Sequence, residues 1–194
     1  MNDQPSAESY IAAAWMLDCD VPAIRAVAET ESGRLGGFND DGSPVILYEA
    51  HIFHQLTGGK FARSHPDLSY PNWKPGNYGS NAMQHQKLER AAALNREAAL
   101  KACSWGLFQI LGANHRAAGH PTVQRMVNAA YRSVDDHLRM FVNFIESNGE
   151  LHDALRSHDW RNFARIYNGP KFEANRYDEK MAAAYERIAA AARS

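Results

Sequence analysis

Cysteine is almost absent from this 194-residue chain, which limits the covalent and metal chemistry open to it. Cys19 and Cys103 are the only two cysteines, and neither belongs to a CxxC pair or a Cys/His ligand spacing. They indicate buried thiols in a reducing compartment, and nothing in the sequence supports a disulfide between them. Neither lies in an evident activating setting for a nucleophile, and no GxSxG elbow is present.

A basic leader and a long hydrophobic run are also missing. The first five residues contain no lysine or arginine, and the apolar run 10–17 is short and followed at once by Asp18 and Asp20. The sequence therefore predicts neither a signal peptide nor a membrane span. Lys and Arg number 21 against 22 Asp and Glu, so no charge excess indicates nucleic acid or an anionic membrane as a partner.

The composition that remains is that of one globular domain. With 45% hydrophobic and 22% charged residues, the chain predicts a single domain over 1–194 with a full core. Apolar residues recur at helical spacing through most of it, with a break expected near Leu94-Asn95. The predicted helices cover 6–17, 21–32, 49–56, 82–102, 122–131, 134–147, 151–156, 159–167 and 177–192.

Two segments depart from the helical pattern. Residues 33–48 combine glycines, an Asp40-Asp41-Gly42 turn signal and a β-branched run, which predicts a small hairpin. Residues 60–81 are rich in Pro, Gly, Ser and aromatics, and loops of that length are usually functional. The fold class is therefore mainly α, in the α+β style, with a minor hairpin lobe.

One of two neighbouring glutamates is suited to hold a proton. Continuing the apolar stripe of Ile24, Val27 and Ala28 leads to Glu31, whereas Glu29 lies on the other face, one turn after Arg25. Glu31 also falls in the last turn of its helix, where the exposed carbonyls disfavour an ionised carboxylate. Partial burial acts in the same direction, so the pattern predicts the raised pKa of a general acid.

Cutting a glycosidic bond needs a second group that activates water or stabilises positive charge on the sugar. Asp40, Asp41 and Glu49 are candidates, although the first two also suit a turn and Glu49 suits a helix start. Tyr70, Trp73 and Tyr78 could stack on sugar faces or pack an Ω-loop. The sequence leaves these alternatives open.

A metal site is the weaker interpretation of the nine histidines. His51 and His54 lie three apart on one helical face, but no third ligand follows from the spacing and HExxH is absent. They are interpreted as packing or hydrogen-bonding histidines, and no metal or other cofactor is predicted. The C-terminal helix carries an apolar stripe that indicates core packing more than contact with membrane or wall; its members are Met181, Ala184, Tyr185, Ile188 and Ala192.

Three motifs in order give a resemblance. Glu31-Ser32-Gly33, the segment 104–110 (Ser-Trp-Gly-Leu-Phe-Gln-Ile) and Tyr167-Asn168-Gly169-Pro170 resemble those of the goose-type lysozyme and lytic transglycosylase superfamily. Together with 26–32 and 44–53, they are more closely similar to the N-acetylmuramidase family of phage endolysins and bacterial cell-wall hydrolases. The resemblance spans roughly residues 20–190 and implies a lysozyme-like helical bundle around a catalytic cleft. Members of the family often carry a separate peptidoglycan-binding module as well, and this sequence departs from them because no such module is expected in it.

The resemblance also implies roles for individual residues. Glu31 matches the catalytic glutamate, Asp40 an assisting acid and Thr57 a hydroxyl residue grouped with them. Ser104 and Gln109 match the cleft floor, and Tyr167 and Asn168 match residues beside the acid. Hydroxyl and amide groups can orient a water or an N-acetyl group without competing for the proton. Glu49 is assigned to substrate binding.

The implied activity is cleavage of the β-1,4 bond between N-acetylmuramic acid and N-acetylglucosamine in peptidoglycan. A lytic transglycosylase with the same glutamate, a catalytically dead glycan-binding module and a zinc amidase are the alternatives. The expected setting is a phage lysis protein that collects in the host cytoplasm until a pore releases it to the wall. It is expected to act as a monomer on glycan strands, without nucleic acid or stable membrane insertion.

Overall fold

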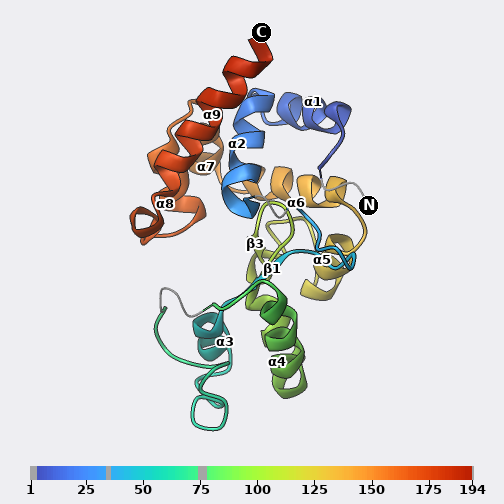
Figure 1. Ribbon diagram of the computed structural model, residues 1–194, viewed down its shortest axis with the longest axis vertical. Coiled ribbons are helices and arrows are strands. Elements are labelled where there is room, and N and C mark those ends of the chain that lie inside the picture. The colour runs from blue at the N-terminus through green and yellow to red at the C-terminus, as the bar shows by residue number, and fades with distance from the viewer. Residues whose placement is uncertain (1–3, 34–35, 74–77, 194) are drawn as a thin grey trace.

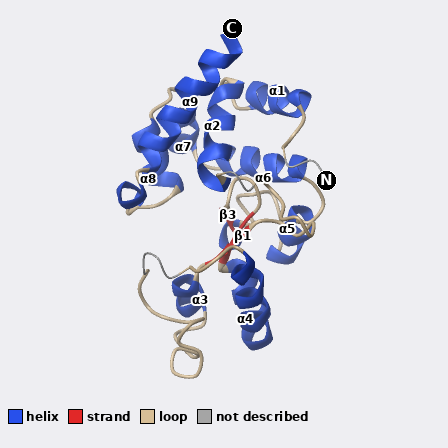
Figure 2. Ribbon diagram, viewed as in Figure 1, coloured by secondary structure: helices blue, strands red, loops and turns tan. Residues whose placement is uncertain are grey.

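The computed structural model describes residues 4–33, 36–73 and 78–193, and helices dominate it (Figures 1 and 2). Most helices begin at a side chain that accepts a hydrogen bond from the third residue along, which satisfies a free backbone N–H. These caps are Ser6, Asp20, Thr122, Ser133, Asn148 and Asp159. The helices are α1 (Ala7–Met16), α2 (Val21–Ser32), α3 (Ala50–Leu56), α4 (Ala82–Lys101), α5 (Val123–Ala130), α6 (Val134–Glu146), α7 (Gly149–Arg156), α8 (Trp160–Tyr167) and α9 (Tyr177–Arg193), with 3-10 turns at Gly112–Asn114 and Phe172–Asn175. The predicted fold class is confirmed.

A small antiparallel sheet lies at the centre of the molecule (Figure 2). Its strands are β1 (Ile46–Tyr48), β2 (Cys103–Trp105) and β3 (Ile110–Leu111), in the order β1-β2-β3. Leu47 pairs with Ser104, and Ser104 also pairs with Leu111. Two helices, α3 and α4, therefore separate β1 from its partner along the chain.

The hairpin predicted over 33–48 forms only at its tip, and the strand that follows pairs elsewhere. Phe38 and Pro44 make an antiparallel bridge, and Asn39 N donates to Ser43 O at 2.8 Å; Arg34 and Leu35 lie outside the described residues. Ile46 and Tyr48 are buried, so β1 needs a partner strand that is itself in the core, and Cys103 and Trp105 provide one. The hairpin of the fold is β2–β3 instead.

Helix α9 lies along helix α2 in the upper part of the molecule (Figure 1). Tyr185 Oη donates a hydrogen bond to Asp20 Oδ2 at 2.9 Å, and Met181 and Ala184 are buried. The stripe on α9 is therefore core over this part of the helix, as predicted, while Ala192 at its end is exposed. No helix within the described residues has the length and apolar composition that crossing a bilayer requires.

Helix α4 is kinked at Asn95, where φ is −157° and ψ is 98°. Asn95 Oδ1 accepts a hydrogen bond from Ala98 N at 3.1 Å, so the side chain caps the second half of the helix as an N-cap would. The predicted break near Leu94-Asn95 is confirmed. The second half then leads into β2, so the kink lies on the path that brings β2 beside β1.

Candidate active site

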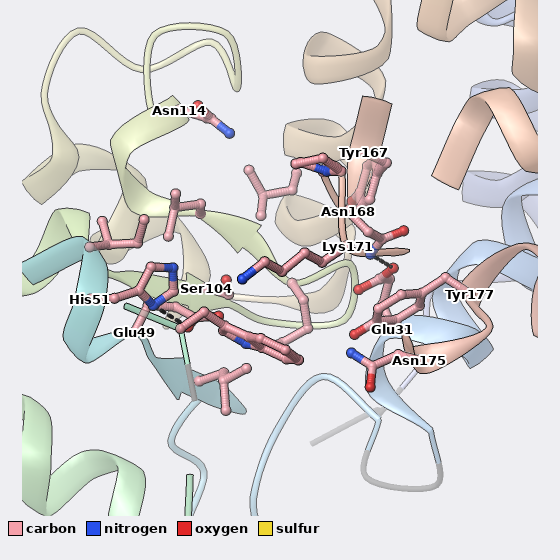
Figure 3. A pocket seen from close by; sticks show the side chains of 18 of the residues that line it. Glu31, Glu49, His51, Ser104, Asn114, Tyr167, Asn168, Lys171, Asn175 and Tyr177 are labelled. Carbon is pink, nitrogen blue, oxygen red and sulfur yellow. Dashed lines mark hydrogen bonds and ion pairs between the residues drawn. The ribbon is translucent and has the colours of Figure 1, made fainter. Parts of the chain in front are cut away.

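A cavity of about 580 Å³ lies where β1, β2 and β3 meet the end of α2 and the α8–α9 connection. Figure 3 shows side chains entering it from several of these elements. The predicted residues that line it are Glu31, Glu49, Ser104, Gln109, Tyr167 and Asn168, together with Trp73 and Tyr78 of the aromatic loop. Segments far apart in the chain are thus brought to one site.

Glu31 enters the cavity from the last turn of α2, which Gly33 ends with a φ of 58°. Burial raises the pKa of Glu31 to about 7, against the opposing effects of a hydrogen bond from Asn168 and the charge of Lys180. The Asn168 amide Nδ2 donates to Glu31 Oε1 at 2.8 Å. A carboxyl group in this state can be protonated near neutral pH, as a general acid requires.

Glu29 is exposed and ion-pairs with Arg187 of α9. The surface location predicted for Glu29 is confirmed, but its predicted partner Arg25 instead lies over the Tyr10 ring, 5.3 Å from the centroid. Helical phase thus separated the two glutamates correctly. The partner of Glu29 depends on the packing of α9, which the helix's own sequence does not specify.

The turn after α8 positions the two residues beside the acid. Tyr167 ends α8 and its hydroxyl donates to Phe108 O at 2.6 Å, which fixes the ring against the β2–β3 hairpin. Asn168 is the C-terminal cap of α8, and Gly169 follows with a φ of 81°. A positive φ is readily adopted only by glycine, so the Tyr-Asn-Gly sequence turns the chain while aiming the amide at Glu31.

The turn between β2 and β3 forms part of the cavity wall. Gln109 adopts a φ of 47°, and its Nε2 donates to Gly106 O at 2.8 Å. Ser104, on β2, is half-buried and lines the cavity. The apolar residues of the same segment are buried and pack in the core; they are Trp105, Leu107, Phe108 and Ile110.

Glu49 lies at the start of α3, and its carboxylate is held by the aromatic loop. Tyr78 Oη donates to Glu49 Oε2 at 2.7 Å, and Trp73 Nε1 donates to Tyr78 Oη at 2.6 Å. His51 Nδ1 lies 3.4 Å from the same Oε2. Burial raises the pKa of Glu49, while the hydrogen bond from Tyr78 opposes the shift.

Two predicted catalytic residues lie away from this lining. Asp40 is exposed on the turn that Phe38 and Pro44 close. Thr57 caps the end of α3, and its Oγ1 donates to Phe53 O at 2.8 Å, so its hydroxyl proton is used within its own helix. Neither is among the residues that line the cavity. Their assisting roles stay predictions.

Some residues of the lining were not predicted from the sequence, and three of them lie between the Tyr-Asn-Gly-Pro motif and the start of α9. Lys171 Nζ lies 5.2 Å from the centre of the Trp73 ring, and Asn175 and Tyr177 follow on the way into α9. Burial, with the charges of Glu31 and Glu49, raises the pKa of Tyr177 to about 12. Lys171 directly follows the Tyr-Asn-Gly-Pro motif, and this position next to the motif is the sequence feature that could have indicated its place in the site.

The described residues contain no group of three or more His, Cys, Asp or Glu that could hold a metal ion. His54 Nδ1 instead lies 3.1 Å from Ser69 Oγ, and His51 contacts Glu49. Both histidines of the candidate pair therefore have a polar partner within the protein. Both cysteines are free thiols; Cys103 is buried and Cys19 half-buried.

Comparisons with known proteins agree with this geometry. The family model for N-acetylmuramidase matches residues 20–189. The crystal structure of the Burkholderia AP3 phage endolysin is similar with a TM-score of 0.83 and 39% sequence identity, over 99% of this chain and 73% of that chain. No curated protein matches. The chain therefore belongs to the N-acetylmuramidase family and, with it, to the peptidoglycan hydrolases.

Proposed function

We propose that the protein is an endolysin-type N-acetylmuramidase that hydrolyses the β-1,4 bond between N-acetylmuramic acid and N-acetylglucosamine, with Glu31 as the general acid. The observation that carries the proposal is the raised pKa of Glu31, about 7, inside a cavity of a chain from this family. An ordinary exposed glutamate would be ionised at neutral pH and would have no proton to donate.

The other lining groups suit a sugar substrate. Trp73, Tyr78 and Tyr177 offer aromatic faces for pyranose rings, and Ser104 and Gln109 offer polar groups for hydroxyl and N-acetyl substituents. Asn168 donates to Glu31 and so holds the acid in one orientation. We further propose that residues 1–194 act as one catalytic unit, as a monomer on glycan strands, and that a phage host's cell wall is reached after release from the cytoplasm.

The test is the pair Glu31→Gln and Glu29→Gln, assayed on outer-membrane-permeabilised cells and purified peptidoglycan. The amide of Glu31→Gln keeps the shape but has no proton to give, so kcat should fall by about 10²–10⁴-fold. Glu29→Gln removes only an exposed ion pair and should stay within about twofold of wild type. An active Glu31→Gln protein would contradict the assignment of the acid.

The products separate hydrolysis from transglycosylation. Water attack leaves reducing muramic acid ends, whereas attack by the muramyl 6-hydroxyl leaves 1,6-anhydro ends. Mass spectrometry of the digest should therefore show reducing ends, and anhydro ends as the main product would contradict hydrolysis. Asp40→Asn and Thr57→Val in the same assay test the assisting roles predicted for these residues.

A further inference from the structure

We propose that Glu49 is the second carboxylate of the site, the base that takes a proton from the attacking water. This inference rests on the proposed function, because it assumes hydrolysis with Glu31 as the acid. It differs from the role that the resemblance implies, in which Asp40 is the assisting acid and Glu49 only binds substrate.

Glu49 and Glu31 line the same cavity, and Figure 3 shows them entering it from opposite sides. Glu49 N donates to Ala102 O at 2.8 Å, which ties this residue to the chain just before β2. Its side chain is only 16% exposed. A substrate in the cavity would therefore lie between two carboxyl groups held on firm elements.

The other two candidates for the second carboxylate, Asp40 and Asp41, lie on the turn and not in the wall of the cavity. Asp40 is exposed and does not line the cavity, and Asp41 Oδ1 accepts hydrogen bonds from Ser43 N at 2.9 Å and Ser43 Oγ at 2.6 Å. Asp41 therefore stabilises the turn, which is the ordinary use of an aspartate in that position. Of the three candidates for the second carboxylate, only Glu49 is among the residues that line the cavity.

Within the described residues, the polar contacts of the Glu49 carboxylate fall on one of its two oxygens. Tyr78 Oη and His51 Nδ1 both approach Oε2, at 2.7 and 3.4 Å. No described residue has a hydrogen bond or ion pair to Oε1. The Tyr78 hydroxyl stabilises the ionised form and fixes the carboxylate plane, while the other oxygen can accept a proton from water.

The negative charges of Glu31 and Glu49 both act on one hydroxyl group of the cavity lining. The pKa of Tyr177 is raised by burial first and then by the negative charges of Glu31 and Glu49. Tyr177 begins α9 and lines the cavity beside Glu31 (Figure 3). Both carboxyl groups therefore act on the same lining residue, which agrees with their shared place in the cavity wall.

In the proposed step, Glu31 donates its proton to the O4 atom of N-acetylglucosamine as the bond from C1 of N-acetylmuramic acid to O4 breaks. A water oxygen bonds to C1 from the opposite face while Glu49 takes one of the water's protons. The products are a free 4-hydroxyl and a reducing end of inverted configuration, and solvent returns the proton from Glu49 to Glu31.

The first experiment compares Glu49→Gln and Glu49→Ala with wild type at saturating peptidoglycan. We expect kcat to fall at least about 100-fold in both, with KM changed by less than about threefold. Azide added to Glu49→Ala should restore at least about tenfold activity and form a muramyl azide of inverted configuration, because azide needs no base. NMR of fresh wild-type products should show inversion.

The second experiment tests the role through the pH profile. The hydrogen bond from Tyr78 lowers the pKa of Glu49, so Tyr78→Phe should raise that pKa and move the acidic limb of kcat/KM to higher pH. The alkaline limb, which belongs to Glu31, should stay in place. A residue with a purely structural role would change the height of the profile but neither limb.

The outcomes separate the two proposals. If Glu31→Gln is inactive and reducing ends form, but Glu49→Gln keeps wild-type kcat, the inference on Glu49 fails alone. Retained configuration, or loss of activity in Asp40→Asn together with full activity in Glu49→Gln, would equally overturn it. Anhydro ends or an active Glu31→Gln protein would instead overturn the proposed function.

Discussion

Glu31 illustrates how a functional carboxyl group costs stability. Its pKa is raised from 4.5 to about 7 in the folded protein, so the folded state binds more protons than the unfolded state between those values. The free energy of unfolding therefore falls as pH rises from about 4.5 to about 7. Complete ionisation of a group shifted this far costs the folded state up to about 3 kcal/mol.

The stability of Glu31→Gln should therefore differ from that of wild type in a way that is independent of catalysis. The amide cannot ionise, so the variant should be more stable than wild type at pH 8 by up to about 3 kcal/mol, with a smaller difference at pH 4. Urea unfolding at both pH values measures it. Glu29→Gln, on the exposed side of α2, is the control and should show no comparable dependence on pH; an equal effect would contradict burial as the cause.

At the scale of single residues, local sequence predicted what depends on local geometry. The phase of α2 predicted that Glu31 points inward. The resemblance implied that Asn168 lies beside the acid, and its amide does donate a hydrogen bond to Glu31. Thr57 shows the limit, because its hydroxyl donates to the carbonyl one turn back and the sequence does not reveal that choice. The place of Tyr177 in the cavity lining could not be predicted, because the sequence around a tyrosine at a helix start does not depend on whether a cavity lies beside it.

At the scale of elements, the helices followed from periodicity and caps, but strand pairing did not. The run 45–48 was recognisable as a strand, yet its partner is β2, beyond α3 and α4. A nearby glycine-rich turn favours a local hairpin because closing a short loop costs little entropy. Ile46 and Tyr48 are buried, however, and they pair with the buried strand β2 instead. Tertiary packing thus overrode the local turn signal.

The β2–β3 turn depends on a glycine that cannot be replaced. Gly106 has a φ of 69°, and a Cβ atom there would lie 2.6 Å from ring atoms of His137. That ring accepts from Leu107 N at 3.1 Å and donates to Ala130 O at 2.7 Å, so it cannot move aside. A side chain at this position would meet both backbone strain and a clash.

We therefore expect Gly106→Ala to lower the free energy of unfolding by at least about 2 kcal/mol and to reduce lysis through the displaced wall of the cavity. Urea unfolding provides the measurement. Gly149→Ala is the matched control: Gly149 begins α7, and a Cβ atom there would have no neighbour within 4 Å, so the change should be neutral or stabilising by up to about 1 kcal/mol. Equal effects of the two substitutions would contradict the role assigned to His137.

At the scale of the whole molecule, the cavity joins parts of the chain that pack separately. Glu49, His51 and Trp73 come from the β1–α3 side, whereas Asn168, Lys171 and Tyr177 come from the α8–α9 side. The site as a whole could not be predicted from the sequence, because its two sides meet only through tertiary packing. The ammonium group of Lys171 over the Trp73 ring is one contact that joins them.

A ligand that touches both sides should therefore stabilise the whole fold. With inactive Glu31→Gln protein, muropeptide tetrasaccharides at about 100 times their Kd should raise the free energy of unfolding by about 2.7 kcal/mol, because the folded state alone presents the assembled cavity. Thermal unfolding measures this as a rise in Tm that depends on ligand concentration. Cellotetraose, which lacks N-acetyl and lactyl groups, should give a smaller rise, since it cannot use the amide and cationic groups that line the cavity. Equal rises with both sugars would mean that ring stacking alone holds the substrate, and no rise at saturation would place the substrate outside this cavity.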